Sequence, residues 1–277
     1  MTRLLTISQA AETLEAYILP AGNVQISFSG GRTSAYMLHQ ILAANGDLNR
    51  NNVRVVFANT GREMPATLDF VAEVQSRWGV VITWVEYIPD APRFKIVSPS
   101  SASQGGEPFA ACITKNKMLP NVGKRFCTKD LKILPAKRYL RSLGWSRWTN
   151  TTGIRADEPL RVRESKDALW VNWHPLVAAQ VRKSDVLNFW GRQPFDLRLE
   201  TTSNCDGCFL KSEANRAAMW RAHPERMQWW ADQERAVGSQ FIWHQPYDAL
   251  GKTVKSQGDW IFDMDGALCQ ADGGDCT

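Results

Sequence analysis

The fold is decided by one stretch near the start of the chain, Val24-Gln25-Ile26-Ser27-Phe28-Ser29-Gly30-Gly31-Arg32-Thr33-Ser34. Its first five residues have the pattern of a short buried strand, and the leucine and methionine content of residues 33–44 predicts a helix directly after it. Glycines at this junction let the backbone turn sharply and approach a ligand closely. The amides of such a turn, together with the N-terminus of the following helix, point at an anion. The stretch therefore predicts a phosphate-binding loop at residues 29–34, whereas an ordinary strand-to-helix turn is the plainer alternative.

The segments after this loop repeat the alternation of strand and helix. Strand-like runs lie at 53–58, 80–85, 148–154 and 170–173, and helix-like runs lie at 65–78 and 129–143. Residues 88–108 are rich in Pro, Ser and Gly and read as a loop. Alternation of this kind implies a parallel sheet with right-handed crossovers. We therefore predict an α/β fold in which an open parallel sheet has helices on both faces.

The texture of the sequence changes after Pro175. Helices are expected at 184–190 and 213–237, and ten of the twelve tryptophans lie from Trp145 onward. Tryptophan at this density mostly supplies packing area in a region that lacks a sheet of its own. We divide the chain into an α/β domain at 1–176 and a helical, Trp- and Cys-rich region at 177–277.

Charge is distributed unevenly along the 277 residues. Residues 89–147 hold twelve basic side chains against three acidic ones, whereas the whole chain has 33 Lys and Arg against 28 Asp and Glu. A concentrated positive charge suits an anionic substrate or a nucleic acid, and a solvated helix face is the alternative.

The first twenty residues carry Glu12 and Glu15 where a signal peptide needs its apolar stretch, and no window approaches the roughly 18 apolar residues of a membrane span. The sequence thus predicts a cytoplasmic protein without a membrane partner. Six cysteines in such a chain indicate metal or redox duty rather than a disulfide scaffold.

The loop at 29–34 resembles the PP-loop of the ATP pyrophosphatase superfamily, and the chain as a whole resembles its phosphoadenosine phosphosulfate (PAPS) reductase branch. The further segments that carry this resemblance, in the order of the family, are 58–65, 125–132, 153–158, and 174–176 followed by 184–186. Together they span residues 24–210. The resemblance implies the adenine nucleotide alpha hydrolase-like fold.

The resemblance also implies an adenine nucleotide, ATP or PAPS, as substrate. Its phosphates would lie on the loop residues Ser29, Gly30, Gly31, Arg32, Thr33 and Ser34. Its adenosine would lie near Asn59, Thr60 and Gly61, with Arg155 as a second phosphate or sulfate contact. Arg125, Lys129 and Lys132 would add charge-assisted contacts, for which surface solvation is the alternative. The loop at 29–34, residues 59–61 and Arg155 all fall at the ends of predicted strands. Ligands of open parallel sheets bind beyond the carboxyl ends of the strands.

One position departs from the superfamily pattern. Many PP-loop enzymes carry Asp where this chain has Thr33, and a carboxylate there helps to organise a magnesium ion beside the phosphates. Nucleotide binding tolerates this change more easily than metal-assisted adenylyl transfer does.

Four cysteines are expected to form one tetrathiolate site: Cys112, Cys127, Cys205 and Cys208. Two cysteines separated by two residues can both face one metal, and a second pair completes four ligands. The basic neighbourhood is expected to lower the thiol pKa values. The resemblance suggests a [4Fe-4S] cluster, while zinc fits four thiolates equally well from sequence alone, and a site without metal is the third alternative.

The C-terminal cysteines, Cys269 and Cys276, are spaced too loosely to assign. True PAPS reductases carry their nucleophilic cysteine near the C-terminus within Glu-Cys-Gly followed by Ile or Leu and His, and the tail of this chain lacks that motif. No catalytic residue is assigned from the sequence.

Two hypotheses about function follow. In the first, the protein is an enzyme of sulfur chemistry that either reduces a nucleotide-activated sulfate or uses ATP to transfer sulfur, with a thiol reductant protein or a sulfur donor as partner. A nucleic-acid substrate and a homo-oligomeric assembly are further partners compatible with the sequence. In the second, the protein is a catalytically silent nucleotide- or nucleic-acid-binding module with a structural zinc.

Overall fold

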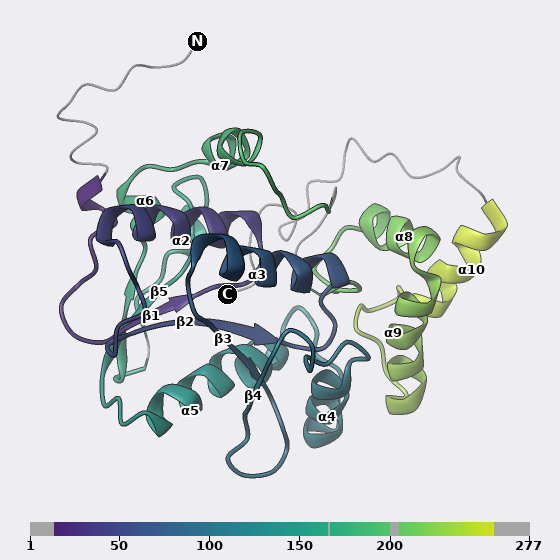
Figure 1. Ribbon diagram of the computed structural model, residues 1–277. Coiled ribbons are helices and arrows are strands. Elements are labelled where there is room, and N and C mark those ends of the chain that lie inside the picture. The colour runs from purple at the N-terminus through teal and green to yellow at the C-terminus, as the bar shows by residue number, and fades with distance from the viewer. Residues whose placement is uncertain (1–13, 166, 200–204, 258–277) are drawn as a thin grey trace.

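The computed structural model describes residues 14–165, 167–199 and 205–257, which form a six-stranded sheet between layers of helices (Figure 1). The strands are β1 (Val24–Ser27), β2 (Val53–Asn59), β3 (Ile82–Glu86), β4 (Lys95–Val97), β5 (Trp148–Thr151) and β6 (Trp170–Trp173), in the spatial order β4-β3-β2-β1-β5-β6. All neighbouring pairs are parallel except β3 and β4. The predicted α/β fold with a mostly parallel sheet is confirmed.

The antiparallel edge strand β4 corrects the prediction of an all-parallel sheet. It lies inside the segment expected to be a loop, and it is only three residues long. Two of its three residues are exposed, and three residues are too few to show the alternation that indicates a half-buried strand.

The helices are α2 (Arg32–Asn45), α3 (Pro65–Trp78), α4 (Glu107–Asn116), α5 (Leu134–Ser142), α6 (Pro175–Ala178), α7 (Lys183–Trp190), α8 (Glu213–Ala222), α9 (Pro224–Val237) and α10 (Tyr247–Gln257). The expected helix at 213–237 is broken because Pro224 lacks the N–H that a continuous helix needs. The expected helix at 129–143 begins as a π-helix, η1 (Thr128–Ile133), which continues into α5. Helices α4 and α10 were not predicted.

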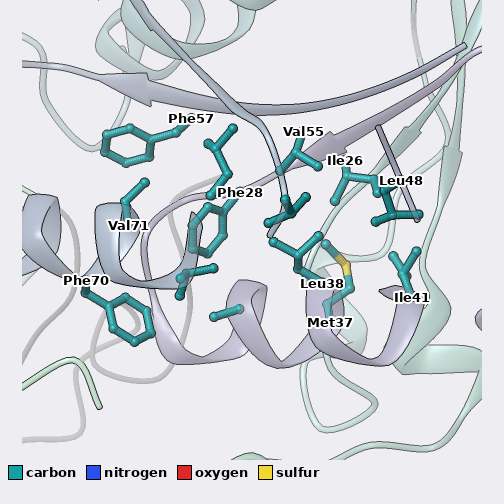
Figure 2. Packing of buried hydrophobic residues seen from close by; sticks show 14 of the residues in the cluster. Ile26, Phe28, Met37, Leu38, Ile41, Leu48, Val55, Phe57, Phe70 and Val71 are labelled. Carbon is teal, nitrogen blue, oxygen red and sulfur yellow. The ribbon is translucent and has the colours of Figure 1, made fainter. Parts of the chain in front are cut away.

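Helices α2 and α3 cover one face of the sheet (Figure 1). Apolar side chains that alternate along β1 and β2 meet the inner faces of these helices in the main core. Figure 2 shows this packing, with Ile26, Phe28, Val55 and Phe57 from the strand side against Met37, Leu38, Ile41, Phe70 and Val71 from the helices. Burial of this face fixes the position of the loop between β1 and α2.

The opposite face is covered unevenly. Helix α5 packs Ala136, Tyr139 and Leu140 against Val56 and Val85 of β2 and β3. Trp148 and Trp170 at the starts of β5 and β6 adjoin this cluster, whereas Gln25, Asn150 and Asn172 place polar side chains on the same face. This part of the sheet is therefore not closed by a hydrophobic core.

The C-terminal helices α8, α9 and α10 form a separate group beside the sheet (Figure 1) and share a second core with α4. Helix α7, by contrast, packs on α2, and the main core extends through Val186 and Trp190 to Leu197. Residue 176, the predicted domain boundary, thus precedes segments that belong to the main core. Among the described residues no helix is long and apolar enough to span a membrane.

Candidate functional site

The loop between β1 and α2 is organised by two serines. Ser34 Oγ accepts the Ser29 N–H at 3.2 Å, lies 2.9 Å from Ser29 Oγ and donates to the Gly31 carbonyl at 3.0 Å. Gly31 is the N-cap residue, with φ −98° and ψ 163°, and no side chain caps α2. The amides in the first turn of α2 therefore lack a capping side chain, which is the arrangement that binds anions at helix N-termini.

Two glycines allow close packing around this loop. Gly30 has φ 80°, and a Cβ there would lie 2.8 Å from Thr67 Cγ2 and 3.1 Å from Phe57 and Val71 side-chain atoms. On the other side, a Cβ at Gly153 would lie 3.2 Å from the Ser34 Cα. The segment after β5 thus lies directly against the loop after β1.

Two of the three arginines assigned to phosphate binding, Arg155 and Arg32, have different partners. Arg155 is buried, donates from Nη1 to Thr33 Oγ1 at 3.2 Å and pairs with Asp157 at 2.9 Å. Arg32 instead forms a two-pronged ion pair with Asp196, at 2.7 and 2.6 Å. Arg155 is therefore part of the loop environment, whereas the Arg32 guanidinium is bound by the segment that follows α7.

The predicted adenosine-binding residues after β2 are bonded within the protein. Asn59 Nδ2 donates to Glu86 Oε1 at 2.6 Å, and Asn59 Oδ1 accepts the Gly61 N–H at 3.1 Å. The Thr60 N–H and hydroxyl both donate to the Glu63 carboxylate at 2.9 Å. These buried bonds shape the end of β2 and leave the two side chains directed into the protein.

A cavity of about 430 Å³ lies on the face of the sheet that α5 leaves open, and it extends to Ser29. Polar side chains from β1, β5 and β6 line it, namely Gln25, Ser27, Asn150 and Asn172. Its basic lining residues are Arg125, Lys132, Lys137, Arg161 and Arg163. Size and chemistry suit an anionic small molecule.

Three of the four predicted metal ligands line a second, smaller cavity of about 30 Å³. These are Cys127, Cys205 and Cys208, and Cys112 on α4 belongs to the same buried cluster. All four are free thiols. Thr60 Oγ1 lies 3.4 Å from Cys205 Sγ, so a residue predicted to bind adenosine also lies beside the cysteines. The structure thus brings the distant cysteine pairs into one neighbourhood.

Arg125 and Lys132 line both cavities. Lys132 lies in the π-helix η1 and Arg125 just before it, in the segment that also contains Cys127. Lys129, the third basic residue predicted from this segment, is exposed and lines neither of the two cavities. The large cavity and the cysteine cavity therefore share a positively charged wall.

Burial has a larger effect on the pKa of two thiols than the nearby basic residues have. It raises the pKa of Cys112 and of Cys205 to about 12 each. Asp130 raises the pKa of Cys112 further, and Glu63 does so at Cys205, where the charge of Lys132 acts in the opposite direction. The expectation that basic residues lower these pKa values is wrong for Cys112 and Cys205, because desolvation of a buried thiolate costs more than the nearby cations return.

The turn between Cys205 and Cys208 is held by Asp206, a fully buried carboxylate that the sequence reasoning missed. Asp206 accepts from Arg62 at 2.5 Å, Arg226 at 2.6 Å and Trp230 Nε1 at 2.7 Å. These donors come from the segment after β2 and from α9. The position of Asp206 inside the Cys-x-x-Cys motif was the only sequence signal for this role.

The described residues contain no group of three or more His, Cys, Asp or Glu side chains that could hold a metal ion as placed. The chemistry of the donor set, four free thiols of which three line a small cavity and the fourth lies in the same buried cluster, nevertheless matches the ligands of an iron–sulfur cluster. Cys269 and Cys276 lie outside the described residues.

Sequence reasoning also missed the polar floor of the large cavity. Gln25 alternates with the buried Val24 and Ile26 of β1, and Asn150 and Asn172 line the same cavity from β5 and β6. Amides on a parallel strand are unusual, because such strands are normally apolar on both faces. That departure was the available signal. His174 also lines the cavity, and its Nδ1 lies 2.9 Å from the Thr152 hydroxyl.

The fold and the loop define an α/β protein of the PP-loop type. The model of one family, the phosphoadenosine phosphosulfate reductase domain, matches residues 23–176, which is more than half of the chain. The protein therefore belongs to the phosphoadenosine phosphosulfate reductase domain family, as the resemblance of its motifs predicted.

Individual relatives were found by sequence and by structure. The uncharacterised nin region protein ORF290 of Escherichia phage lambda is 34% identical over 200 residues, which cover 68% of this chain and 66% of that protein. A PAPS reductase from Candida auris, solved as a phosphate complex, is 18% identical with a TM-score of 0.44 and covers 69% of this chain and 88% of its own. The U34-tRNA thiolase NcsA from Methanococcus maripaludis, solved with its [4Fe-4S] cluster, is 12% identical with a TM-score of 0.42, covering 88% of each chain.

Proposed function

We propose that the protein is an enzyme that binds an adenine nucleotide at residues 29–34 and carries out sulfur chemistry beside it. The observation that carries this proposal is the wall shared by the two cavities. Arg125 and Lys132 face both the large cavity that reaches Ser29 and the small cavity lined by cysteines. Two charges there can neutralise phosphate oxygens and still stand beside the thiols.

The uncapped N-terminus of α2 supports the phosphate part of the proposal. Gly31 and the hydroxyls of Ser29 and Ser34 surround amides that have no capping side chain. Arg155, held by Asp157, adds a buried cation beside Thr33. A phosphate chain would satisfy these donors, and a bound magnesium ion would draw its ligands mainly from the phosphates and water, because Thr33 supplies no carboxylate.

Of the two sulfur reactions we favour ATP-dependent transfer, because none of the six cysteines lies in the Glu-Cys-Gly motif of the reductases. In this reaction a carbonyl oxygen of the acceptor attacks the α-phosphorus of ATP and pyrophosphate leaves. Sulfide from a donor then attacks the activated carbon, and AMP departs with the oxygen. The exposed basic residues Lys117, Lys124 and Lys129 suit a nucleic acid as the acceptor.

Cys112, Cys127, Cys205 and Cys208 would hold the [4Fe-4S] cluster. When bound, the cluster would tie α4, the segment before η1 and the Cys-x-x-Cys turn together and supply a redox centre next to the large cavity. The buried network around Asp206 holds that turn through contacts with Arg62, Arg226 and Trp230.

The phosphate site is tested with Gly31→Asp. Because Gly31 has φ −98°, an aspartate there can cap α2 and place its carboxylate where a phosphate would bind. We expect folding to be kept while pyrophosphate release from ATP, or sulfite release from PAPS, is lost. Gly31→Asn, which caps without a charge, should retain part of the activity. Full turnover by a folded Gly31→Asp variant would show that the loop does not bind phosphate.

The cysteine site is tested by the absorption spectrum and the iron, sulfide and zinc content of protein purified without oxygen. We expect an absorption shoulder at about 400 nm and stoichiometric iron. Cys205→Ser should lose both, and Cys276→Ser, outside the proposed ligand set, should keep them. If the protein instead contains one zinc ion and shows no turnover, the enzyme hypothesis is wrong and the protein is a binding module with a structural zinc.

A further inference from the structure

Three amide side chains form a row across the floor of the large cavity. Strand register places Gln25 of β1 opposite Asn150 of β5, and Asn150 opposite Asn172 of β6. All three line the cavity. They come from positions up to 147 residues apart in the chain, so only the sheet brings them into one line.

The row is linked by hydrogen bonds but not saturated by them. Gln25 Nε2 donates to Ser27 Oγ at 3.1 Å, and Ser27 Oγ donates to Asn150 Oδ1 at 3.0 Å. Asn172 Nδ2 donates to the Arg163 carbonyl at 2.9 Å, whereas the Asn150–Asn172 contact is long at 3.5 Å. An amide carries two donor hydrogens and an acceptor oxygen with two lone pairs. The row thus retains donors and acceptors for a ligand above it.

Aromatic surface adjoins the row toward the start of the strands. Trp148 and Trp170 are register neighbours and stack with ring centroids 5.5 Å apart. Lys137 lies over the Trp170 ring at 5.5 Å. Trp148 is buried, and its Nε1 has no hydrogen-bond partner among the described residues. A flat heteroaromatic ligand would meet apolar aromatic surface here, beside the amide row.

The amide row and the loop at 29–34 lie at opposite ends of one strand, β1, and its continuation to Ser29. Gln25 and Ser29 are four residues apart, which corresponds to about 13 Å in an extended strand. Both line the same cavity. A separation of this size matches the span of a nucleotide from its base to its outer phosphates.

We propose that the amide row Gln25–Asn150–Asn172 is the base-reading floor of the nucleotide site. The base lies over the row toward Trp148 and Trp170, and the phosphates extend to residues 29–34. An amide can donate and accept at once, which is the pattern that asparagine and glutamine use to pair with adenine. This inference rests on the proposed nucleotide binding and moves the base away from Asn59 and Thr60.

The test is calorimetric titration of the full chain with ATP, AMP and inorganic pyrophosphate. Asn150→Leu should weaken ATP and AMP binding about tenfold or more and leave pyrophosphate binding unchanged, because only the base contacts are lost. Asn188→Leu, the same substitution at an exposed position of α7, is the matched control and should bind all three ligands like the wild type.

Circular dichroism and thermal melting establish that each variant is folded. Should Asn150→Leu fail to fold, Asn172→Ala replaces it, since Asn172 makes few bonds within the protein. Unchanged ATP affinity in a folded row variant would overturn the base-reading role and leave the proposed function intact. A wild-type protein that binds neither ATP nor pyrophosphate would instead overturn the proposed function itself.

Discussion

Gly30 combines two requirements that only glycine meets. Its φ of 80° lies in the left-handed region, and a Cβ would press on Thr67, Phe57 and Val71. The first requirement is typical of any tight turn, and the sequence pattern predicts it. The second depends on α3 lying against the loop, which the sequence pattern does not show.

Gly30→Ala is therefore expected to lower the free energy of unfolding by more than the backbone strain of an alanine at positive φ would by itself. Gly79→Ala is the matched control, because Gly79 has φ 62° and a Cβ added there would meet no atom within 4 Å. We expect a loss of about 1 kcal/mol in the free energy of unfolding for Gly79→Ala. Gly30→Ala should cost a further ~1–3 kcal/mol from overpacking. Equal losses in urea unfolding of the two variants would contradict the packing argument.

At the scale of elements, local patterns identify the parts that have one buried face. The strand and helix on either side of the loop, and α3 at 65–78, were predicted closely because apolar periodicity marks them. The π-helix η1 was not predicted, because its sequence pattern is that of an α-helix, and the hydrogen bonds that span one more residue are set by packing.

The packing of α2 against α3 and α7 buries a histidine, and we therefore expect the free energy of unfolding to depend on pH. His39 of α2 packs on Trp78 and Phe189, and burial lowers its pKa below the ordinary value of 6.5. The unfolded chain then binds the proton more tightly, so the free energy of unfolding falls as the pH drops through 6.5 toward the folded pKa. The slope for one such histidine is at most about 1.4 kcal/mol per pH unit.

His39→Leu should reduce this pH dependence, because the leucine cannot titrate and suits the aromatic surroundings. The measurement is denaturant unfolding between pH 7.5 and 5.0, with His244→Gln at an exposed position as control. The same slope in wild type and His39→Leu would assign the pH dependence to other groups, of which His174, whose pKa is also lowered by burial, is the first to examine.

At the scale of the whole molecule, Asp206 joins the C-terminal helices to the sheet. Arg62 follows β2, while Arg226 and Trp230 belong to α9, and all three donate to this one buried carboxylate. The same contacts hold the turn between Cys205 and Cys208. The cysteine site therefore depends on how the two groups of elements pack.

Asp206→Ala is expected to cost about 3–5 kcal/mol in the free energy of unfolding, because it leaves two arginines without their buried partner. It should also lower the iron content of protein purified without oxygen. Asp232→Ala, which removes an exposed ion pair with Arg235, is the control and should cost less than about 1 kcal/mol. Wild-type stability of Asp206→Ala would show that the network does not hold the turn.

The local sequence determined the glycine turn at 29–34 and the order of the main strands and helices of the α/β fold. Both follow from short-range rules: glycines at a strand-to-helix junction, and apolar periodicities of a strand or a helix. The family motifs also marked Cys127, Lys132 and Arg155 as site residues, and each lies at a cavity wall or beside the loop.

Only the tertiary structure decided which of these residues meet. In the folded protein Arg32 pairs with Asp196, and Arg155 donates a hydrogen bond to Thr33. The side chain of Asn59 is directed into the protein, where it donates to a carboxylate. The tertiary structure also aligned Gln25 with Asn150 and brought the distant cysteine pairs together. These outcomes depend on strand register and on packing between segments far apart in the chain, and no local pattern carries that information.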